Sequence, residues 1–387
     1  MSAPLDLRSG KPPLVVVVGS GGVGKTTLAA ALGLVSAQQG IDSLVMTFDP
    51  SLRLKDALGV GMAAEDEEIP VAVPSTRGEA PAGILNASLL DARRTFDRLI
   101  LAEVEDEAER QRILGNHYYQ HLAGHLGGIL EYMAVERLYE VAQEGRYGRL
   151  VLDTPPTAQA IDFLEAPQRI VSFLDSGALK LALKPWFDDK GRLRGKFGLS
   201  FLAKPLEQFL DKIVGLQLLR DMSEFFQAFE PMFEGFRDRA REVEKLLRSP
   251  ETVFVLVTGP GEARIPDTLF FARRLKEAGL RLGPIVVNRV HPHYVPAGEE
   301  KEELREGLEL LEWLGASHRK GIIELRRLLP PDQVVVELPL EAGEPTSLEA
   351  LAKFGQDFQT RLEAASKPFS RAVAESALLK GRLGEDA

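Results

Sequence analysis

The sequence predicts an α/β protein: a mostly parallel central sheet flanked by helices, with a helical insertion layer added to it. Short apolar runs rich in β-branched residues have the length and composition of buried strands, at residues 14–19, 43–49, 149–154, 252–258, 283–289 and 333–339. Helical patterns separate these runs, which favours parallel strands joined by right-handed crossovers. A glycine cluster directly after the first run indicates a tight turn into the first helix.

That turn has the composition of a phosphate-binding loop. Gly19, Gly24, Lys25 and Thr26 occupy the fixed positions of G-x-x-x-x-G-K-[ST], with a buried strand before the loop and a helix after it. The backbone amides and the helix N-terminus would attract phosphate, Lys25 would reach the β- and γ-phosphates, and Thr26 would ligate Mg²⁺. We therefore predict a P-loop NTPase whose nucleotide contacts are Gly21, Gly22, Val23, Gly24, Lys25, Thr26 and Thr27. The alternative is a glycine-rich turn that matches by chance.

Two further strands end in a carboxylate. Asp49 lies at the end of the second predicted strand and Asp153 near the end of the third. Ligands of open parallel sheets bind at this edge, where a carboxylate can hold Mg²⁺ or orient the attacking water. We predict a metal site of Thr26, Asp49 and Asp153, with Lys25 and Asp49 as the catalytic residues. Each aspartate could instead cap the turn that follows it.

Length and composition bound the remaining possibilities. The chain has 387 residues, a net charge of -10 and no cysteine. The acidic balance argues against nucleic-acid binding, and the absence of thiols excludes disulfides and fits the cytoplasm. No signal peptide or membrane span is indicated. Residues 61–82 read as a surface loop. We expect one ATPase domain with helical insertions at 86–145 and 158–248, and a tail at 367–387 that is either flexible or a frayed helix.

Four ordered segments resemble the ATPase family of the arsenite pump and the tail-anchored-protein targeting factor. GSGGVGKTT, FDPSLRLKDAL, LDTPPTAQAIDFL and VVNR match that family's motifs GKGGVGKT, TDPAH-x-L-x-D, DTAPTGHTLR and VVN, over residues 14–350. The segment 127–138 also resembles the family's P-G-x-x-E, with Glu131 as its acidic residue. The resemblance implies an ATPase dimer, of two identical chains or with a paralogue, that sandwiches two Mg·ATP. It also implies that Asn288 reads the adenine ring, although this residue could simply start the turn into Arg289.

The resemblance further implies switch segments at 49–56 and 153–162, ordered by the γ-phosphate. The sequence departs from the family's motifs in the glycine loop and in both switch segments. Ser20 stands where the family has a lysine that crosses the dimer interface, and Arg53 is a conceivable substitute for that charge. Ala158 and Gln159 replace Gly-His in the second switch segment. The absence of cysteine excludes a thiolate arsenite site and a zinc-stapled dimer.

The helical block at 170–236 is rich in phenylalanine: Phe197, Phe201, Phe209, Phe225, Phe226, Phe229 and Phe233. These residues could form a surface for a hydrophobic-helix protein client, or they could pack helix against helix. His117, His121 and His125 recur at helical spacing and could bind a metal, although solvated histidines are commoner.

We predict a Mg-dependent ATP-hydrolysing dimer whose nucleotide state switches this hydrophobic helical region. A MinD/ParA-like positioning ATPase, a small-molecule ligase or kinase, and a nucleotide-binding regulatory partner with little turnover remain open.

Overall fold

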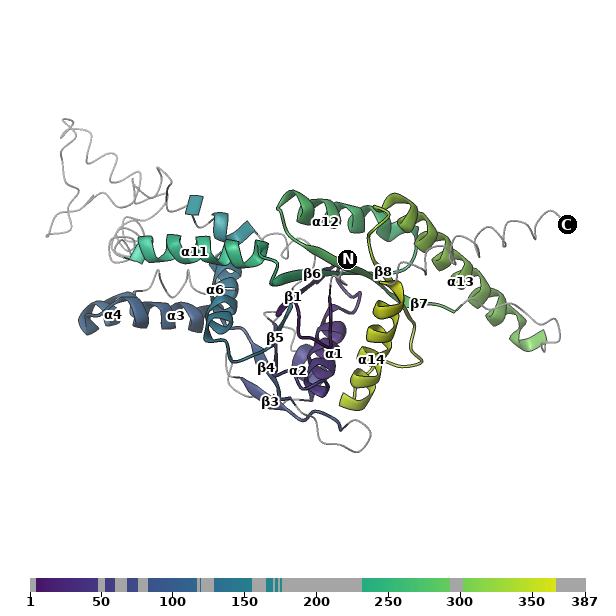
Figure 1. The fold of residues 1–387 in the computed structure, drawn as a ribbon, viewed down its shortest axis with the longest axis horizontal. Coiled ribbons are helices and arrows are strands. Elements are labelled where there is room, and N and C mark those ends of the chain that lie inside the picture. The colour runs from purple at the N-terminus through teal and green to yellow at the C-terminus, as the bar shows by residue number, and fades with distance from the viewer. Residues whose placement is uncertain are drawn as a thin grey trace, which may run out of the picture. The chain divides into compact units, whose positions relative to one another are not determined.

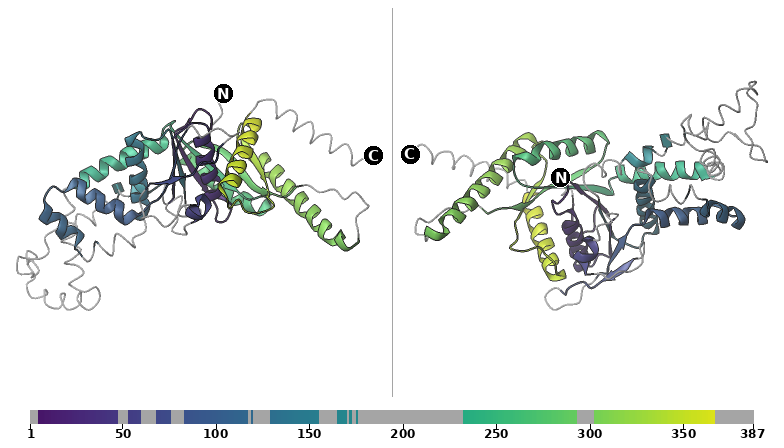
Figure 2. Two further views of the ribbon diagram at one scale, coloured as in Figure 1. Left: turned by 90° about the horizontal axis from the view of Figure 1, so that it is seen from below. Right: turned by 180° about the vertical axis from the view of Figure 1, so that it is seen from behind.

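The chain forms two compact units in the computed structural model. The first comprises residues 1–89, 144–160 and 247–387, and the second comprises residues 90–143 and 161–246. The structure describes residues 5–47, 53–59, 68–75, 83–116, 119, 129–154, 165–169, 171–172, 175, 232–292 and 302–366. Figures 1 and 2 show the arrangement of the elements within each unit.

The first unit is built on an eight-stranded sheet with the order β3-β4-β2-β5-β1-β6-β7-β8. Its strands are β1 (Leu14–Gly19), β2 (Ser43–Thr47), β3 (Ile69–Val71), β4 (Leu85–Leu89), β5 (Arg149–Asp153), β6 (Thr252–Thr258), β7 (Leu282–Val290) and β8 (Val335–Pro339). All neighbours pair in parallel except β3 and β4, which are antiparallel. The predicted fold class, a mostly parallel sheet flanked by helices, is confirmed.

Helices cover both faces of this sheet. They are α1 (Lys25–Gln38), α2 (Arg53–Leu58), α12 (Ile265–Glu277), α13 (Glu302–Leu328) and α14 (Leu348–Ala365), with a short 3₁₀ helix, η2 (Glu262–Arg264), before α12. Figure 1 shows α1 and α14 side by side on one face and α12 on the other. Because both faces are buried, the central strands carry apolar side chains at almost every position, as in β1 and β6.

The face under α1 and α14 allows close packing. A Cβ added to Gly33 of α1 would lie 2.3 Å from Cγ2 of Val45, and one added to Gly355 of α14 would lie 2.8 Å from the carbonyl oxygen of Ala31. Both distances are too short for a side chain, so glycine at these positions lets α1 lie close to β2 and α14 lie close to α1. This packing holds the N-terminus of α1 at the carboxyl end of β1.

Strands β3 and β4 were not predicted from the sequence. β4 lies at the start of the range 86–145, for which helices were expected, and β3 lies in the expected loop. β4 carries Asn86 and Ser88, and β3 is a three-residue edge strand containing Pro70, so neither has the apolar character of the other strands. Pairing with β2 therefore determines β4 more than its own composition does.

The second unit is helical. It contains α3 (Ala92–Glu103), α4 (Glu107–Leu114), and most of α6 (Ile129–Glu144) and α11 (Phe233–Arg248). Asp91 and Asp106 begin α3 and α4 by accepting hydrogen bonds from first-turn amides. A separate core fills this unit, with Phe96, Tyr132 and Phe236 among its buried side chains. The expected division into one domain with two insertions stays a prediction. No helix in the part of the chain that the structure describes could cross a membrane.

Candidate functional site

A glycine loop joins β1 to α1 at the carboxyl edge of the sheet. Gly19, Gly22 and Gly24 have φ values of 149°, 73° and 94°, which favour glycine. A Cβ on Gly19 would lie 2.1 Å from the carbonyl oxygen of Val257, and one on Gly24 would lie 2.4 Å from Nδ2 of Asn288. The neighbouring strands β6 and β7 therefore press directly against this loop, and only glycine fits at these two positions.

Lys25 follows the loop directly and is the first residue of α1. The Lys25 ammonium group donates a hydrogen bond to the carbonyl oxygen of Ser20 at 3.0 Å, and Lys25 is only 7% exposed. The N-cap of α1 is Gly24, which has no side chain to accept hydrogen bonds from the first-turn amides. A helix N-terminus of this kind, with a lysine beside it, is suited to bind an anion.

Thr26 faces the end of β5. Its hydroxyl donates to Oδ2 of Asp153 at 2.7 Å, and the hydroxyl of Thr47, the last residue of β2, donates to the same oxygen at 3.2 Å. Asp153 is 1% exposed. The structure thus brings together Thr26 and Asp153, two of the three predicted metal ligands. Thr47 was not predicted as a site residue, because the sequence places it inside the expected strand at 43–49, two residues before Asp49.

Asn288 ties β7 to the glycine loop. Its Nδ2 donates to the carbonyl oxygen of Val23 at 2.8 Å, and its Oδ1 accepts from the backbone N–H of Arg289 at 2.9 Å. Arg289 has φ 62°, and its guanidinium donates to the carbonyl oxygen of Gly22 at 3.1 Å. In this structure the Asn288 amide therefore holds the loop and starts the turn, and its contact with adenine stays a prediction.

Several predicted residues lie outside the part of the chain that the structure describes. They are Asp49, switch residues 155–162, the row His117, His121 and His125, and the tail at 367–387. Glu131 lies in α6. Of the seven phenylalanines singled out in the block at 170–236, the structure describes Phe233, which packs partly buried against the core of the helical unit.

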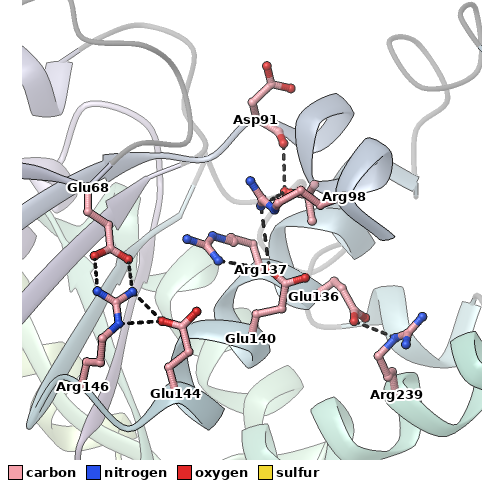
Figure 3. Close-up of polar contacts among 10 residues, drawn as sticks. Glu68, Asp91, Arg98, Glu136, Arg137, Glu140, Glu144, Arg146 and Arg239 are labelled. Atoms are coloured by element: carbon pink, nitrogen blue, oxygen red, sulfur yellow. Dashed lines mark hydrogen bonds and ion pairs between the residues drawn. The ribbon is translucent and has the colours of Figure 1, made fainter. Parts of the chain in front are cut away.

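The helical unit contains a buried polar cluster between α6 and α11. Nε of Arg239 lies 2.9 Å from Oε1 of Glu136, whose side chain is fully buried (Figure 3). The hydroxyl of Tyr132 donates a hydrogen bond to Oε2 of Glu136 at 2.8 Å. Arg239 also pairs with Glu103 and lies over the ring of Phe236. Burial raises the pKa of the Glu136 carboxyl, against the opposing effect of Arg239.

Comparisons with known proteins support the sequence motifs. A sequence model of the family described as anion-transporting ATPase matches residues 13–360. "Putative arsenical pump-driving ATPase 1" of Aquifex aeolicus is 24% identical over 359 residues, covering 89% of this chain and 78% of the relative. "ATPase GET3A" of Arabidopsis thaliana is 24% identical over 89% of this chain and 83% of its own length. "ATPase GET3B" of the same plant is 26% identical over 71% of this chain and 63% of its own length. The predicted family and the predicted enzyme class, an ATPase, are confirmed.

Proposed function

Because this chain belongs to the family of anion-transporting ATPases, we propose that it binds Mg·ATP in the loop at 19–26 and hydrolyses the β–γ phosphoanhydride. The observation that carries the proposal is the Thr26–Asp153 contact of 2.7 Å beside a loop that requires glycine at Gly19 and Gly24. Lys25 and Thr26 begin α1 directly after this loop, so phosphate bound here would meet the positive end of the helix and the lysine charge. Contacts from Gly21, Gly22, Val23, Gly24, Lys25, Thr26 and Thr27 would hold the phosphates.

The residues at the end of β5 fit magnesium. The Thr26 hydroxyl and the Asp153 carboxylate are hard oxygen donors, the kind that Mg²⁺ takes alongside phosphate oxygens and water. Magnesium, when bound, would offset negative charge on the β- and γ-phosphate oxygens. Thr47 donates to Asp153 and so orients the carboxylate toward Thr26. In the proposal Asp153 remains at the magnesium site throughout the reaction.

Hydrolysis needs three further contributions from the chain. A water oxygen attacks the γ-phosphorus while the bond to the β–γ bridging oxygen breaks, and ADP leaves with the electron pair. A proton of the water passes to a phosphate oxygen, so that the products are ADP and inorganic phosphate. Lys25 would stabilise the charge that accumulates on the bridging and γ-oxygens. Asp49 would orient the water and reach the metal site from the end of the second strand. Asn288 would fix the loop and, in our proposal, also contact adenine.

We extend the proposal to a dimer, of identical chains or with a paralogue, whose switch segments at 49–56 and 153–162 respond to the γ-phosphate. The apolar block at 170–236 would then bind a hydrophobic-helix client in one nucleotide state, in the cytoplasm. One relative's name refers to an arsenical pump, but this chain has no cysteine for a thiolate site. Ser20 supplies no charge across a dimer, which keeps a regulatory partner with little turnover as the second candidate.

Steady-state ATP hydrolysis with and without Mg²⁺ tests the proposal, together with the variant Asp49→Asn. We expect Mg-dependent turnover in the natural chain, and nucleotide binding without most of the turnover in the variant, since the carboxylate acts only as the γ-phosphoryl group leaves. ATP binding without turnover in the natural chain would instead favour the regulatory partner. Absence of ATP binding would overturn both.

A further inference from the structure

Arg289 has a strained backbone near the carboxyl end of β7. Its φ of 62° lies in the left-handed region, and within the part of the chain that the structure describes it is the one residue other than glycine with a positive φ. A bulge lies here, because β7 has one more residue than β8 between two successive pairs, Val287–Glu337 and Val290–Pro339. This conformation is unfavourable for a residue with a Cβ. Such strain persists where neighbouring contacts fix it, most often at functional sites.

The guanidinium of Arg289 reaches the glycine loop from this bulge. Its Nη1 donates a hydrogen bond to the carbonyl oxygen of Gly22 at 3.1 Å, and the backbone N–H of Arg289 donates to Oδ1 of Asn288 at 2.9 Å. Its Nη2 lies 3.6 Å from Oε1 of Glu344 in the segment after β8. The side chain of Glu344 is 83% exposed, so water screens this ion pair and it contributes little. The contact with the loop therefore dominates the environment of the guanidinium.

The position of this contact determines which way a loop amide points. A trans peptide is planar, and its C=O and N–H point in opposite directions. A donor that fixes the Gly22 carbonyl therefore also fixes the Val23 N–H on the opposite side of the same peptide. In the proposed function this N–H is one of the loop amides that hold phosphate. A positive charge at the carbonyl oxygen polarises the peptide and makes its N–H a stronger hydrogen-bond donor.

The loop has little else to hold it at Gly22. The φ of Gly22 is 73°, and a Cβ added there would meet no atom within 4 Å, so side-chain packing does not order this part of the loop. Between residues 19 and 26 the sequence supplies one positive side chain, Lys25, for a ligand with several negative charges. Arg289 adds both a tie to the loop and a second positive charge beside it.

We propose that Arg289 is a positioning residue of the phosphate site. Its guanidinium holds the Gly22 carbonyl, directs the Val23 amide at the bound phosphate and adds a positive charge to that of Lys25. The inference rests on the proposed binding of ATP. Arg289 differs in this role from Asn288, whose neutral amide holds the next carbonyl of the loop.

Isothermal titration of the full chain with Mg·ATP tests this role. Arg289→Gln should weaken ATP binding about three- to tenfold, a moderate loss because the guanidinium is half-exposed and water screens part of its charge. Arg289→Lys should keep most of the affinity, because it retains the positive charge. The matched control is Arg281→Gln just before the other end of β7, which removes a guanidinium hydrogen bond of 3.1 Å to the carbonyl oxygen of Pro250 and should leave ATP affinity unchanged. Glu344→Gln removes the other partner of Arg289 and should also leave it unchanged.

The variant Arg289→Gly separates a role in binding from a role in the fold. Glycine adopts a φ of 62° without strain, and its backbone N–H can still donate to Asn288. The midpoint of thermal unfolding without ligand should therefore not fall, whereas ATP affinity should fall as it does in Arg289→Gln. A fall in both quantities would assign Arg289 to the fold and overturn the inference.

The titrations also separate this inference from the proposed function. A natural chain that binds no ATP overturns both. A natural chain that binds ATP, with an affinity that Arg289→Gln leaves unchanged or that Arg281→Gln lowers equally, overturns the role of Arg289 alone. An equal loss in Glu344→Gln would mean that Arg289 acts through the segment after β8, and Arg289→Lys as weak as Arg289→Gln would mean that the charge is not used. Either result overturns the inference.

Discussion

Asn288 offers a quantitative test of how the nucleotide loop is held. The residue is 6% exposed and makes two hydrogen bonds, from Nδ2 to Val23 at 2.8 Å and from the Arg289 N–H to Oδ1 at 2.9 Å. Asn288→Ala removes both. At about 0.5–1.5 kcal/mol for each neutral hydrogen bond, the total cost is about 1–3 kcal/mol.

Loss of these hydrogen bonds destabilises the ordered conformation of the glycine loop in the protein without ligand. A smaller fraction of the molecules then has a loop that can bind ATP, so the apparent affinity for ATP falls by up to about 5- to 150-fold. Isothermal titration with ATP measures the loss. Asn86→Ala is the matched control, because it removes a hydrogen bond of 2.7 Å that Asn86 of β4 donates to the Tyr147 hydroxyl, and it should leave ATP affinity unchanged.

Titration of the same variant with GTP separates two roles of Asn288. An equal loss of ATP and GTP affinity means that Asn288 acts by holding the loop, whereas a larger loss for ATP means that its amide also reads adenine. Unchanged ATP affinity in Asn288→Ala would refute the reasoning, because the observed hydrogen bonds would then contribute nothing to the binding-competent loop.

Three further predictions follow from the described contacts. Gly24→Ala should lose ATP affinity strongly, because its Cβ would meet Asn288 in addition to the cost of φ 94°, whereas Gly22→Ala, with φ 73° and open space, should cost only about 1–2 kcal/mol in nucleotide titrations. Asp153→Asn should abolish the dependence of ATP affinity on Mg²⁺, and a Mg-dependence equal to that of the natural chain would remove Asp153 from the metal site. Arg239→Met should destabilise the protein to urea by about 3–5 kcal/mol at pH 8, because the buried Glu136 carboxylate keeps its hydrogen bond from Tyr132 but loses the positive charge that offsets its own. Burial raises the pKa of Glu136, so the folded state holds this proton more firmly than the unfolded state, and the loss should shrink as the pH falls toward 5. Glu136→Gln should rescue Arg239→Met at pH 8, and a loss independent of pH would contradict this cause.

The strands were predictable where burial on both faces required continuous apolar residues, as in β1 and β6. β4 was not, because Asn86 and Ser88 interrupt its apolar pattern and its pairing with β2 is a long-range contact. The same distinction applies to the site. The spacing of Gly24, Lys25 and Thr26 defines a local structure that a short segment carries by itself.

Two contacts between distant segments of the site could not be read from the sequence. The hydroxyl of Thr47 reaches Asp153, and the Asn288 amide reaches the backbone of Val23, only after the sheet has assembled. A hydrogen bond to a backbone carbonyl cannot be inferred from the types of side chain in a sequence. The role of Asn288 in holding the loop was therefore found only from the structure. The roles of Asp49 and of residues 155–162 stay predictions from the sequence.

The proposed binding and hydrolysis of ATP depend most directly on Lys25. Steady-state hydrolysis of Mg·ATP by the natural chain should be compared with Lys25→Ala and with Lys276→Ala, which removes an exposed lysine from α12. We predict a loss in kcat/KM of at least about tenfold for Lys25→Ala, because a charge-assisted contact worth about 1.5–3 kcal/mol disappears, and no change for the control. Normal ATP affinity and normal turnover in Lys25→Ala would contradict the account.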